Sequence, residues 1–415
     1  MSVFFKSRIK IFISCCFVVI IFRILFNLYG WHNTMRLWNI PVMYPNFADS
    51  RGIASSAESK AQGLDPMVNN PNDPWGRPLN YPRIWQYLYF FGINKSHTPF
   101  IAFSFLLFFL IGVCLILPNP NNIMISIVLA ALFSPVTLFS FERGNVDLFI
   151  FFIVAISILC IRKYHFLSCF FLLFAFLLKL FPIFGIVIFL KLNRKNFIRY
   201  LIFVFIFGIL YVFFTFSDLE TIKNTTPQST YYSYGFNVFW MTISYFHSNL
   251  ESITKLISYL ALGISFLYAL TSLFNNEFKQ DAIQNKLIYL DAFRMGSSIY
   301  IGTFLLGNNY DYRLIFLILT IPMLILWIKS DLKISILGII ILVSVLLLMW
   351  NPIIEKISSE IPNSYFICFS LKELSSWVVF SGFLYLTFWS MPDWIKMYSK
   401  DMRIILQSFI QKLKK

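Results

Sequence analysis

Apolar residues in this chain occur in long blocks rather than at the spacing of an amphipathic helix. Blocks of about 20 apolar residues with few charges are typical of transmembrane helices. The pattern therefore predicts an all-α polytopic membrane protein, a helical bundle of about 10–12 transmembrane segments. The expected spans are 11–30, 99–117, 122–141, 146–161, 166–190, 199–216, 253–273, 288–306, 314–328, 333–350 and 371–390.

Polar segments separate these blocks. The longest is the first loop, 31–98, and middle-sized loops are predicted at 217–252, 274–287 and 351–370. We expect residues 1–392 to form a single transmembrane domain. The tail, 393–415, mixes basic and apolar residues and is predicted to be an amphipathic helix on the cytoplasmic leaflet. No internal repeat is evident, which argues against a secondary transporter.

The basic residues predict the orientation. Lys6, Arg8 and Lys10 should hold the N-terminus inside, which places loop 31–98 on the extracytoplasmic side. The basic stretch from Lys191 to Arg199 conflicts with this, because it would lie outside if 166–190 crossed the bilayer once.

Lys179 and Pro182 suggest how the conflict is resolved. A charge at mid-bilayer is costly and proline interrupts a helix, so 166–190 is predicted to be a bent pair of short helices. Such a pair enters and leaves on the inside and has Lys179 at its apex. The alternative is eleven plain crossings, with one strongly basic loop outside.

Composition narrows the class further. The chain is 58% hydrophobic and only 13% charged, whereas a soluble domain carries about a quarter charged residues. The net charge of +15 lies largely in loops and termini, so no nucleic-acid partner is predicted. The six cysteines and four histidines lack metal-ligand spacing, and we expect no metal site or cofactor.

Polar residues that could carry chemistry collect on the predicted outer side. They are Asp49 in the first loop, the stretch Glu142-Arg143-Gly144-Asn145-Val146-Asp147, a tyrosine-rich loop at 217–252, and Tyr310-Asp311-Tyr312-Arg313, with Lys179 approaching from within the bundle. A carboxylate can accept a proton from an attacking hydroxyl, and fixed cations can stabilise a departing phosphate. Structural interpretations remain open: Glu142 and Arg143 as an ion pair capping a hairpin, Lys179 as a snorkelling side chain, and Asp49 as a solvated residue.

These motifs resemble the polytopic glycosyltransferases of the GT-C type, in particular the GT87 (DUF2029) family of bacterial mannosyltransferase-like proteins. The resemblance rests on Asp49 followed by Gly63-Leu64-Asp65-Pro66 and Asn80-Tyr81-Pro82, on the 142–147 stretch, on Leu178-Lys179-Leu180-Phe181-Pro182, and more weakly on 310–313. Two positions depart from the family pattern, Arg83 in place of a proline and Met67 in place of a frequent tyrosine.

The resemblance implies a GT-C helical bundle in the inner (plasma) membrane with its active site on the extracytoplasmic side. Asp49 matches the catalytic base of the family. Residues implied to hold the donor phosphate are Lys179, Arg143 and Arg313, and those implied to bind substrate are Glu142, Asn145, Asp147, Asn80, Tyr81 and Asp311.

The implied reaction is a single inverting transfer of a mannose-like hexose. The donor would be a polyprenyl-phosphate sugar, and the acceptor a hydroxyl of a glycan or glycolipid. Two other functions stay open at this point: a flippase or other carrier of lipid-linked saccharides, and a surface-polysaccharide polymerase that uses diphosphate-linked donors.

Overall fold

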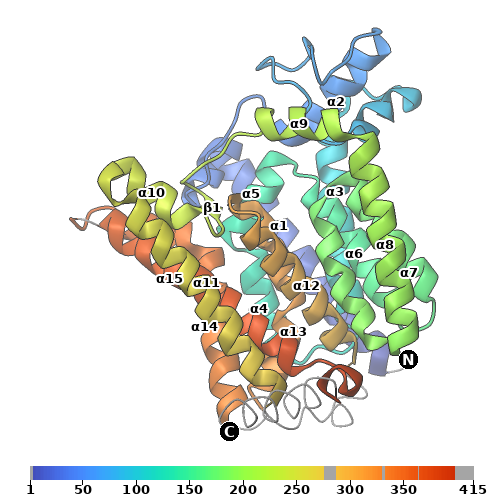
Figure 1. Ribbon diagram of the computed structural model, residues 1–415. Coiled ribbons are helices and arrows are strands. Elements are labelled where there is room, and N and C mark those ends of the chain that lie inside the picture. Colours follow the sequence, from blue (N-terminus) through green and yellow to red (C-terminus); the bar gives the residue numbers. More distant parts are fainter. Residues whose placement is uncertain (1–2, 275–286, 330–331, 363, 398–415) are drawn as a thin grey trace, which may run out of the picture.

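The computed structural model describes residues 3–274, 287–329, 332–362 and 364–397, and these are almost entirely helical (Figure 1). The longer helices are α1 (Val3–Leu37), α3 (Thr98–Ile116), α8 (Arg194–Phe214), α11 (Glu251–Phe274), α12 (Leu287–Leu305), α14 (Leu332–Ser358) and α15 (Ser364–Trp389). The shorter ones are α2 (Ala48–Ala61), α4 (Asn122–Leu132), α5 (Pro135–Arg143), α6 (Asp147–Cys160), α7 (His165–Leu178), α9 (Phe216–Thr225), α10 (Val238–Phe246) and α13 (Ile321–Trp327).

Tighter 3-10 helices and one small sheet complete the fold. The 3-10 segments are η1 (Arg83–Phe91), η2 (Lys95–His97), η3 (Phe181–Lys191), η4 (Ser248–Leu250) and η6 (Asp311–Leu319). Strands β1 (Ser233–Tyr234) and β2 (Asn309–Tyr310) pair antiparallel, with Ser233 opposite Tyr310. Helices α2 and α9 lie at one end of the bundle, which we call the α2 end (Figure 1).

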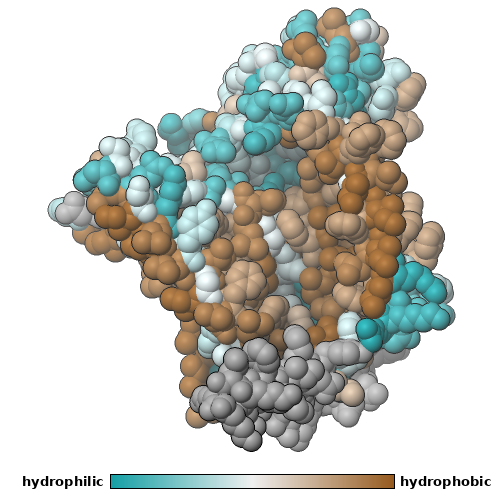
Figure 2. Space-filling view, in the orientation of Figure 1, coloured by the Kyte–Doolittle hydropathy of each residue, from teal (hydrophilic) through white to brown (hydrophobic). Residues whose placement is uncertain are grey.

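The prediction of an all-α polytopic membrane protein is confirmed. Six helices among the described residues are long and apolar enough to cross a membrane, or seven if the bent pair α4–α5 is one span. Fewer long helices are found than the expected spans because α6, α7 and η3 are apolar but short. Apolar residues cover the middle of the visible face, and hydrophilic residues gather at the α2 end (Figure 2).

Two expected segments have different boundaries in the structure. The span predicted over 122–141 is bent by 49° between α4 and α5. Ser134 ends the first part, since its hydroxyl accepts the Thr137 N–H as an N-cap and Pro135 begins the next helix. The loop predicted at 351–370 is short, because α14 continues through Pro352 to Ser358.

The segment 166–190 is interrupted at Lys179. Helix α7 ends at Leu178, Lys179 is extended at φ −166° and ψ 130°, and η3 begins at Phe181. Helix α7 packs against α6, whereas η3 packs against α12 and α8. The Leu178 carbonyl accepts a hydrogen bond from Trp85 of η1, and η1 packs on α2. Lys179 therefore lies toward the α2 end.

The first loop is a folded unit rather than an open chain. Arg77 pairs with Asp73 at 3.0 Å, and Arg83 pairs with Asp65 at 2.9 Å and with Asp218 of α9 at 2.8 Å. Arg83, one of the departures from the family pattern, thus ties this loop to α9. The unit gives α2 a fixed support.

The predicted tail helix over 393–415 falls mostly on residues outside the described ranges, which end at 397, and so does most of the loop 274–287. Both stay predictions, as do the domain boundaries.

Candidate active site

The turn between α5 and α6 presents the central polar residues. Helix α5 ends at Gly144, which adopts a left-handed φ of 57°. A Cβ at Gly144 would lie 2.6 Å from the Ser50 hydroxyl, so a side chain is excluded both by conformation and by space. Beyond it, the Asn145 side-chain oxygen accepts the Asp147 N–H at 2.8 Å. This local bond fixes the orientation of the Asn145 side chain.

Asp49 lies in the first turn of α2, against this turn. The Ser50 hydroxyl donates to the Gly144 carbonyl at 2.5 Å, and Arg77 donates to the Ala48 carbonyl at 2.8 Å. The Asn145 amide donates to Asp49 Oδ2 at 2.5 Å. Among the described residues nothing donates a hydrogen bond to Asp49 Oδ1. Asp49 is therefore held from one side, and its second oxygen is available to a ligand.

Two cations lie on the other side of Asn145 and share one buried carboxylate. Lys179 Nζ is 2.7 Å from Asp147 Oδ1, and Arg313 Nε is 3.4 Å from Asp147 Oδ2. Lys179 also lies 3.5 Å from the Asn145 side-chain oxygen, and Arg313 donates to the Asn309 side chain. Lys179 and Arg313 share one paired carboxylate, so both keep N–H donors that can bind a further anion.

Aromatic rings enclose the Lys179 ammonium. Its nitrogen lies 5.3 Å from the centroid of Tyr81, 5.5 Å from that of Tyr312 and 6.0 Å from that of Phe181, within the range of cation–π attraction. Burial, and then the negative charge of Asp49, raise the pKa of Tyr81 well above its ordinary value, so this phenol stays neutral. The rings exclude water and strengthen electrostatic interactions inside the site.

Not every predicted residue joins this cluster. Glu142 and Arg143 lie beside it but pair with each other at 2.9 Å, and Glu142 also accepts the Met43 N–H at 2.9 Å. Asp311 pairs with Lys372 of α15 at 2.6 Å. Asn80 makes no side-chain hydrogen bond to any described residue. The residues brought together are Asp49, Tyr81, Asn145, Asp147, Lys179 and Arg313.

The sequence analysis assigned no role to the residues that orient the cluster. Ser50 and Arg77 hold the start of α2, Asn309 holds Arg313, and Tyr312 covers Lys179. Arg77 follows Asp73 by four residues, Asn309 lies next to the 310–313 motif, and Tyr312 lies within that motif. In the part of the chain that the structure describes, no group of three or more His, Cys, Asp or Glu side chains could hold a metal.

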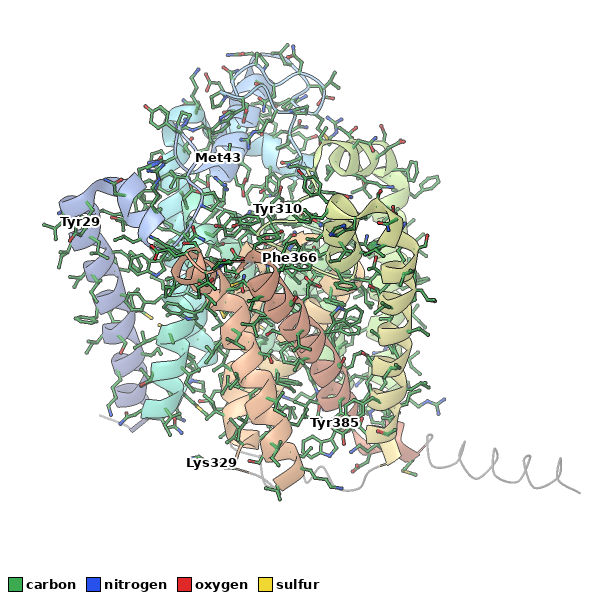
Figure 3. The ribbon with its side chains drawn as sticks, turned by 90° about the vertical axis from the view of Figure 1, so that its left-hand side faces the viewer. Tyr29, Met43, Tyr310, Lys329, Phe366 and Tyr385 are labelled. Atoms are coloured by element: carbon green, nitrogen blue, oxygen red, sulfur yellow. The ribbon has the colours of Figure 1, made fainter. Side chains whose placement is uncertain are left out.

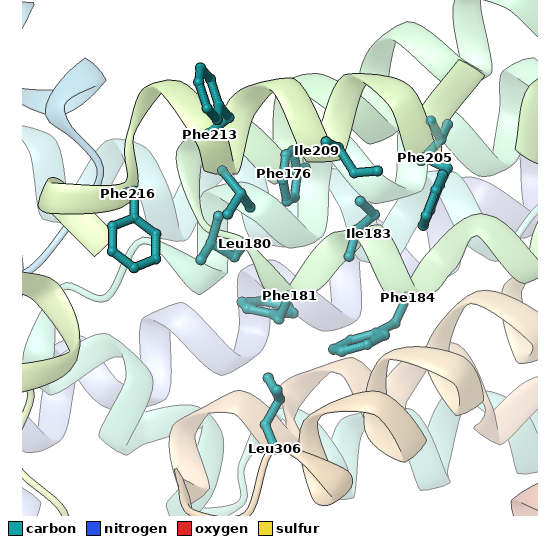
Figure 4. Close-up of a pocket in the computed structure, with 13 residues that line it drawn as sticks. Phe176, Leu180, Phe181, Ile183, Phe184, Phe205, Ile209, Phe213, Phe216 and Leu306 are labelled. Atoms are coloured by element: carbon teal, nitrogen blue, oxygen red, sulfur yellow. The ribbon is translucent and has the colours of Figure 1, made fainter. Parts of the chain in front are cut away.

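An apolar groove leads to the cations. Its volume is about 840 Å³, and side chains of α7, η3 and α8 surround it, with Leu306 at its edge (Figure 4). Leu180 and Phe181 line the groove directly after Lys179, and Arg313 Cζ lies 4.5 Å from the Phe181 ring centroid. A second apolar hollow, of about 450 Å³, shares Ile183 and Phe184 with the groove and continues along η3 to Leu190. An apolar path therefore runs along η3 to the polar cluster.

Comparison with known proteins finds a family match over part of the chain. Residues 89–274 match the model of glycosyltransferase family 87. The matched segment includes the 142–147 stretch and Lys179, whereas Asp49 and Arg313 lie outside it. The resemblance inferred from the sequence is confirmed over this segment. No curated protein and no solved structure matches the chain.

Proposed function

We propose that this membrane glycosyltransferase, with its family 87 segment at 89–274, transfers a sugar from a polyprenyl-phosphate donor. The sugar is a mannose-like hexose, and the acceptor is a hydroxyl of a glycan or glycolipid. The reaction occurs on the extracytoplasmic side, to which the α2 end of the bundle is assigned by the positive-inside rule. Asp49 is the catalytic base, and the anomeric carbon is inverted.

The observation that carries the proposal is the junction of the apolar groove with the cation pair. A prenyl chain lying in the groove against Leu180 and Phe181 would bring its phosphate to Lys179 and Arg313. A water-soluble nucleotide sugar would have no use for an apolar path of this size. The long chain also holds the reacting carbon in place, which lowers the entropic cost of reaction.

The chemistry then follows from the positions of the charges. Asp49 Oδ1 accepts the proton of the acceptor hydroxyl, whose oxygen forms the new bond to the anomeric carbon. The bond between that carbon and the phosphate oxygen breaks, and polyprenyl phosphate leaves with the bonding electron pair. Negative charge grows on the phosphate as this happens, and the two cations are already placed to stabilise it.

The test replaces Asp49 by asparagine, which keeps the size and one hydrogen-bonding oxygen but removes the base. In purified protein in lipid nanodiscs, Asp49→Asn should lower sugar transfer from a polyprenyl-phosphate hexose by about 10²–10⁴-fold. Glu58→Gln is the matched control, because Glu58 lies on the same helix and its side chain contacts Lys95, away from the cluster. Transfer by Asp49→Asn at the wild-type rate would refute the role of Asp49.

The donor class has its own test. Polyprenyl-monophosphate, polyprenyl-diphosphate and nucleotide sugars carrying the same hexose are compared as donors. We expect turnover with the monophosphate alone. Preferred use of the diphosphate would instead identify a polymerase-type enzyme.

A further inference from the structure

A small polar pocket lies between the β1 segment and the hairpin of α14 and α15. Its lining includes Tyr231, Ser233, Glu355, Tyr365, Lys372 and Glu373. The cavity volume is about 10 Å³, close to the space that one water-sized group needs. The pocket is separate from the apolar groove and shares no lining residue with it.

The pocket contains a buried carboxylate without a partner. Glu373 is only 4% exposed, and neither of its oxygens has a hydrogen-bond partner among the described residues. The neighbouring Lys372 is already used by Asp311, and Asp311 Oδ1 is also unpartnered. A buried polar group left without a hydrogen bond is unfavourable, and the described residues supply no donor to Glu373, so a ligand hydroxyl would satisfy it.

Two tyrosines stand at this pocket. The rings of Tyr231 and Tyr365 are parallel within 6°, with centroids 6.3 Å apart, and Tyr231 is 44% exposed. Burial and the nearby Glu355 carboxylate raise the pKa of Tyr231 to about 12, so its hydroxyl stays neutral. An exposed aromatic face beside acceptor oxygens suits a ligand with one apolar face and several hydroxyls.

The pocket is joined to the candidate active site through the small sheet. Ser233 pairs with Tyr310, and the Asp311 N–H donates to the Tyr232 carbonyl at 2.8 Å. Phe139 contacts both Tyr232 and Tyr312, each with centroids 5.6 Å apart, and Tyr312 covers Lys179. Figure 3 shows Tyr310, Phe366 and Met43 in the same half of the molecule, opposite Lys329 and Tyr385.

We propose that this pocket is a subsite for the acceptor: Glu373 accepts a hydrogen bond from one hydroxyl of a neutral sugar, such as a hexose hydroxymethyl group, while the sugar ring lies on Tyr231. Because this inference names the acceptor as a carbohydrate, it rests on the proposed transferase reaction. The volume of the pocket admits one hydroxyl and not a whole ring. The pocket therefore binds a single substituent of the sugar, while the sugar ring stays outside at the pocket entrance.

Direct binding tests the subsite without any donor. Saturation-transfer NMR is recorded on the full-length protein in nanodiscs with a methyl hexopyranoside and with its 6-deoxy counterpart. We expect the 6-deoxy sugar to bind about tenfold more weakly, because it lacks the hydroxyl that hydrogen-bonds to the Glu373 carboxyl group. Glu373→Ala should weaken the parent sugar by a similar factor of about ten and remove the difference between the two sugars.

Two further variants test whether weaker binding by Glu373→Ala could result from misfolding. Tyr231→Ala changes a half-exposed side chain and should also weaken binding of both sugars. Glu251→Ala makes the same chemical change as Glu373→Ala at an exposed position, where Glu251 pairs with Lys255, and should leave binding unchanged. Equal binding of both sugars by the wild type, unchanged binding in Glu373→Ala, or no binding of either sugar would each overturn the subsite.

The binding test of the acceptor subsite can fail or succeed independently of the test of the proposed transfer reaction. Asp49→Asn should retain sugar binding while it loses transfer. Failure of the transfer assay together with hydroxyl-dependent binding at Glu373 would count against the reaction alone. Normal transfer with an unaltered acceptor KM in Glu373→Ala would count against the subsite alone.

Discussion

Asn145 separates the opposite charges of the candidate site. Its amide donates to Asp49 at 2.5 Å, while its oxygen accepts the Asp147 N–H at 2.8 Å and faces Lys179 at 3.5 Å. The backbone bond fixes which end of the amide points toward each charge. Asp49 bonds to Asn145 while Lys179 pairs with Asp147, so the proposed base and the proposed phosphate-binding cations are neighbours that do not pair directly.

Lys179→Ala should impair the donor side of the reaction more than the acceptor side. The substitution removes one of two cations near the donor phosphate, and we expect the donor KM to rise by about tenfold or more while the acceptor KM changes little. Steady-state kinetics with each substrate varied separately measures this. Lys179→Arg, which keeps the charge, should recover part of the loss. Equal increases in both KM values would instead indicate a structural role.

The charge partners of Lys179 and Asp311 could not be predicted from the sequence. Lys179 was recognisable because an ionisable side chain within an apolar segment is rare and costly. Its partner Asp147 lies 32 positions away along the chain, and Arg313, which shares that carboxylate, lies 166 positions from Asp147. Asp311 is two residues from Arg313, yet it pairs with Lys372. Only the packing of α15 against η6 determines that Asp311 pairs with Lys372 and not with a residue of the candidate site.

At the scale of elements, the α5–α6 turn packs directly against the start of α2. Gly144 lets the turn approach Ser50, whose hydroxyl bonds to the Gly144 carbonyl. This contact places Asp49 beside Asn145.

Gly144→Ala should therefore damage both stability and activity. A left-handed alanine costs about 1–2 kcal/mol, and the new methyl group would press on Ser50. We expect a lower melting temperature in nanodiscs and a reduced transfer rate. Gly263→Ala on α11 is the control, because nothing lies within 4 Å of a Cβ there. Wild-type behaviour of Gly144→Ala would show that the close approach is not required.

The groove offers a steric test on α8. Gly208 lines it, and a Cβ at this position would lie 3.5 Å from Ile183 Cδ1, an ordinary contact. Gly208→Ala should be tolerated, whereas Gly208→Phe should fill the groove and raise the KM of a long-chain polyprenyl donor by about tenfold.

A donor shortened to a single prenyl unit should be used equally by the wild type and Gly208→Phe. Gly263→Phe adds the same bulk on α11, where a Cβ meets nothing within 4 Å, and should leave donor use unchanged. Normal kinetics of Gly208→Phe with the long-chain donor would exclude the groove as the lipid site.

At the scale of the whole molecule, the polar chemistry gathers toward one end of an apolar bundle. The cluster around Asn145 lies toward the α2 end, and apolar residues cover the middle of the visible face (Figure 2). Such one-sided chemistry fits an enzyme that meets a polar acceptor at the membrane surface and a lipid-borne donor from within the bilayer.

Orientation is testable by single cysteines in a background whose six cysteines are replaced by alanine. Gln62→Cys on the α2 side should react with a membrane-impermeant maleimide added to intact cells. Asn193→Cys, between η3 and α8, should react only after the cells are permeabilised. Both positions are exposed, so both should label fully in lysed membranes. Labelling of Asn193→Cys in intact cells would contradict the bent-pair orientation.

The sequence by itself determined the membrane-spanning helical class and the family resemblance that the match over 89–274 supports, because long apolar blocks and short motifs are properties of neighbouring residues. It also singled out Asp49 and Lys179 as the residues to examine. The tertiary structure decided which charges meet, that Glu142 and Arg143 pair with each other, and where the apolar groove opens. Those outcomes depend on how distant helices pack and which faces they turn inward. The hydropathy pattern along the chain does not show how each helix is rotated about its axis in the bundle.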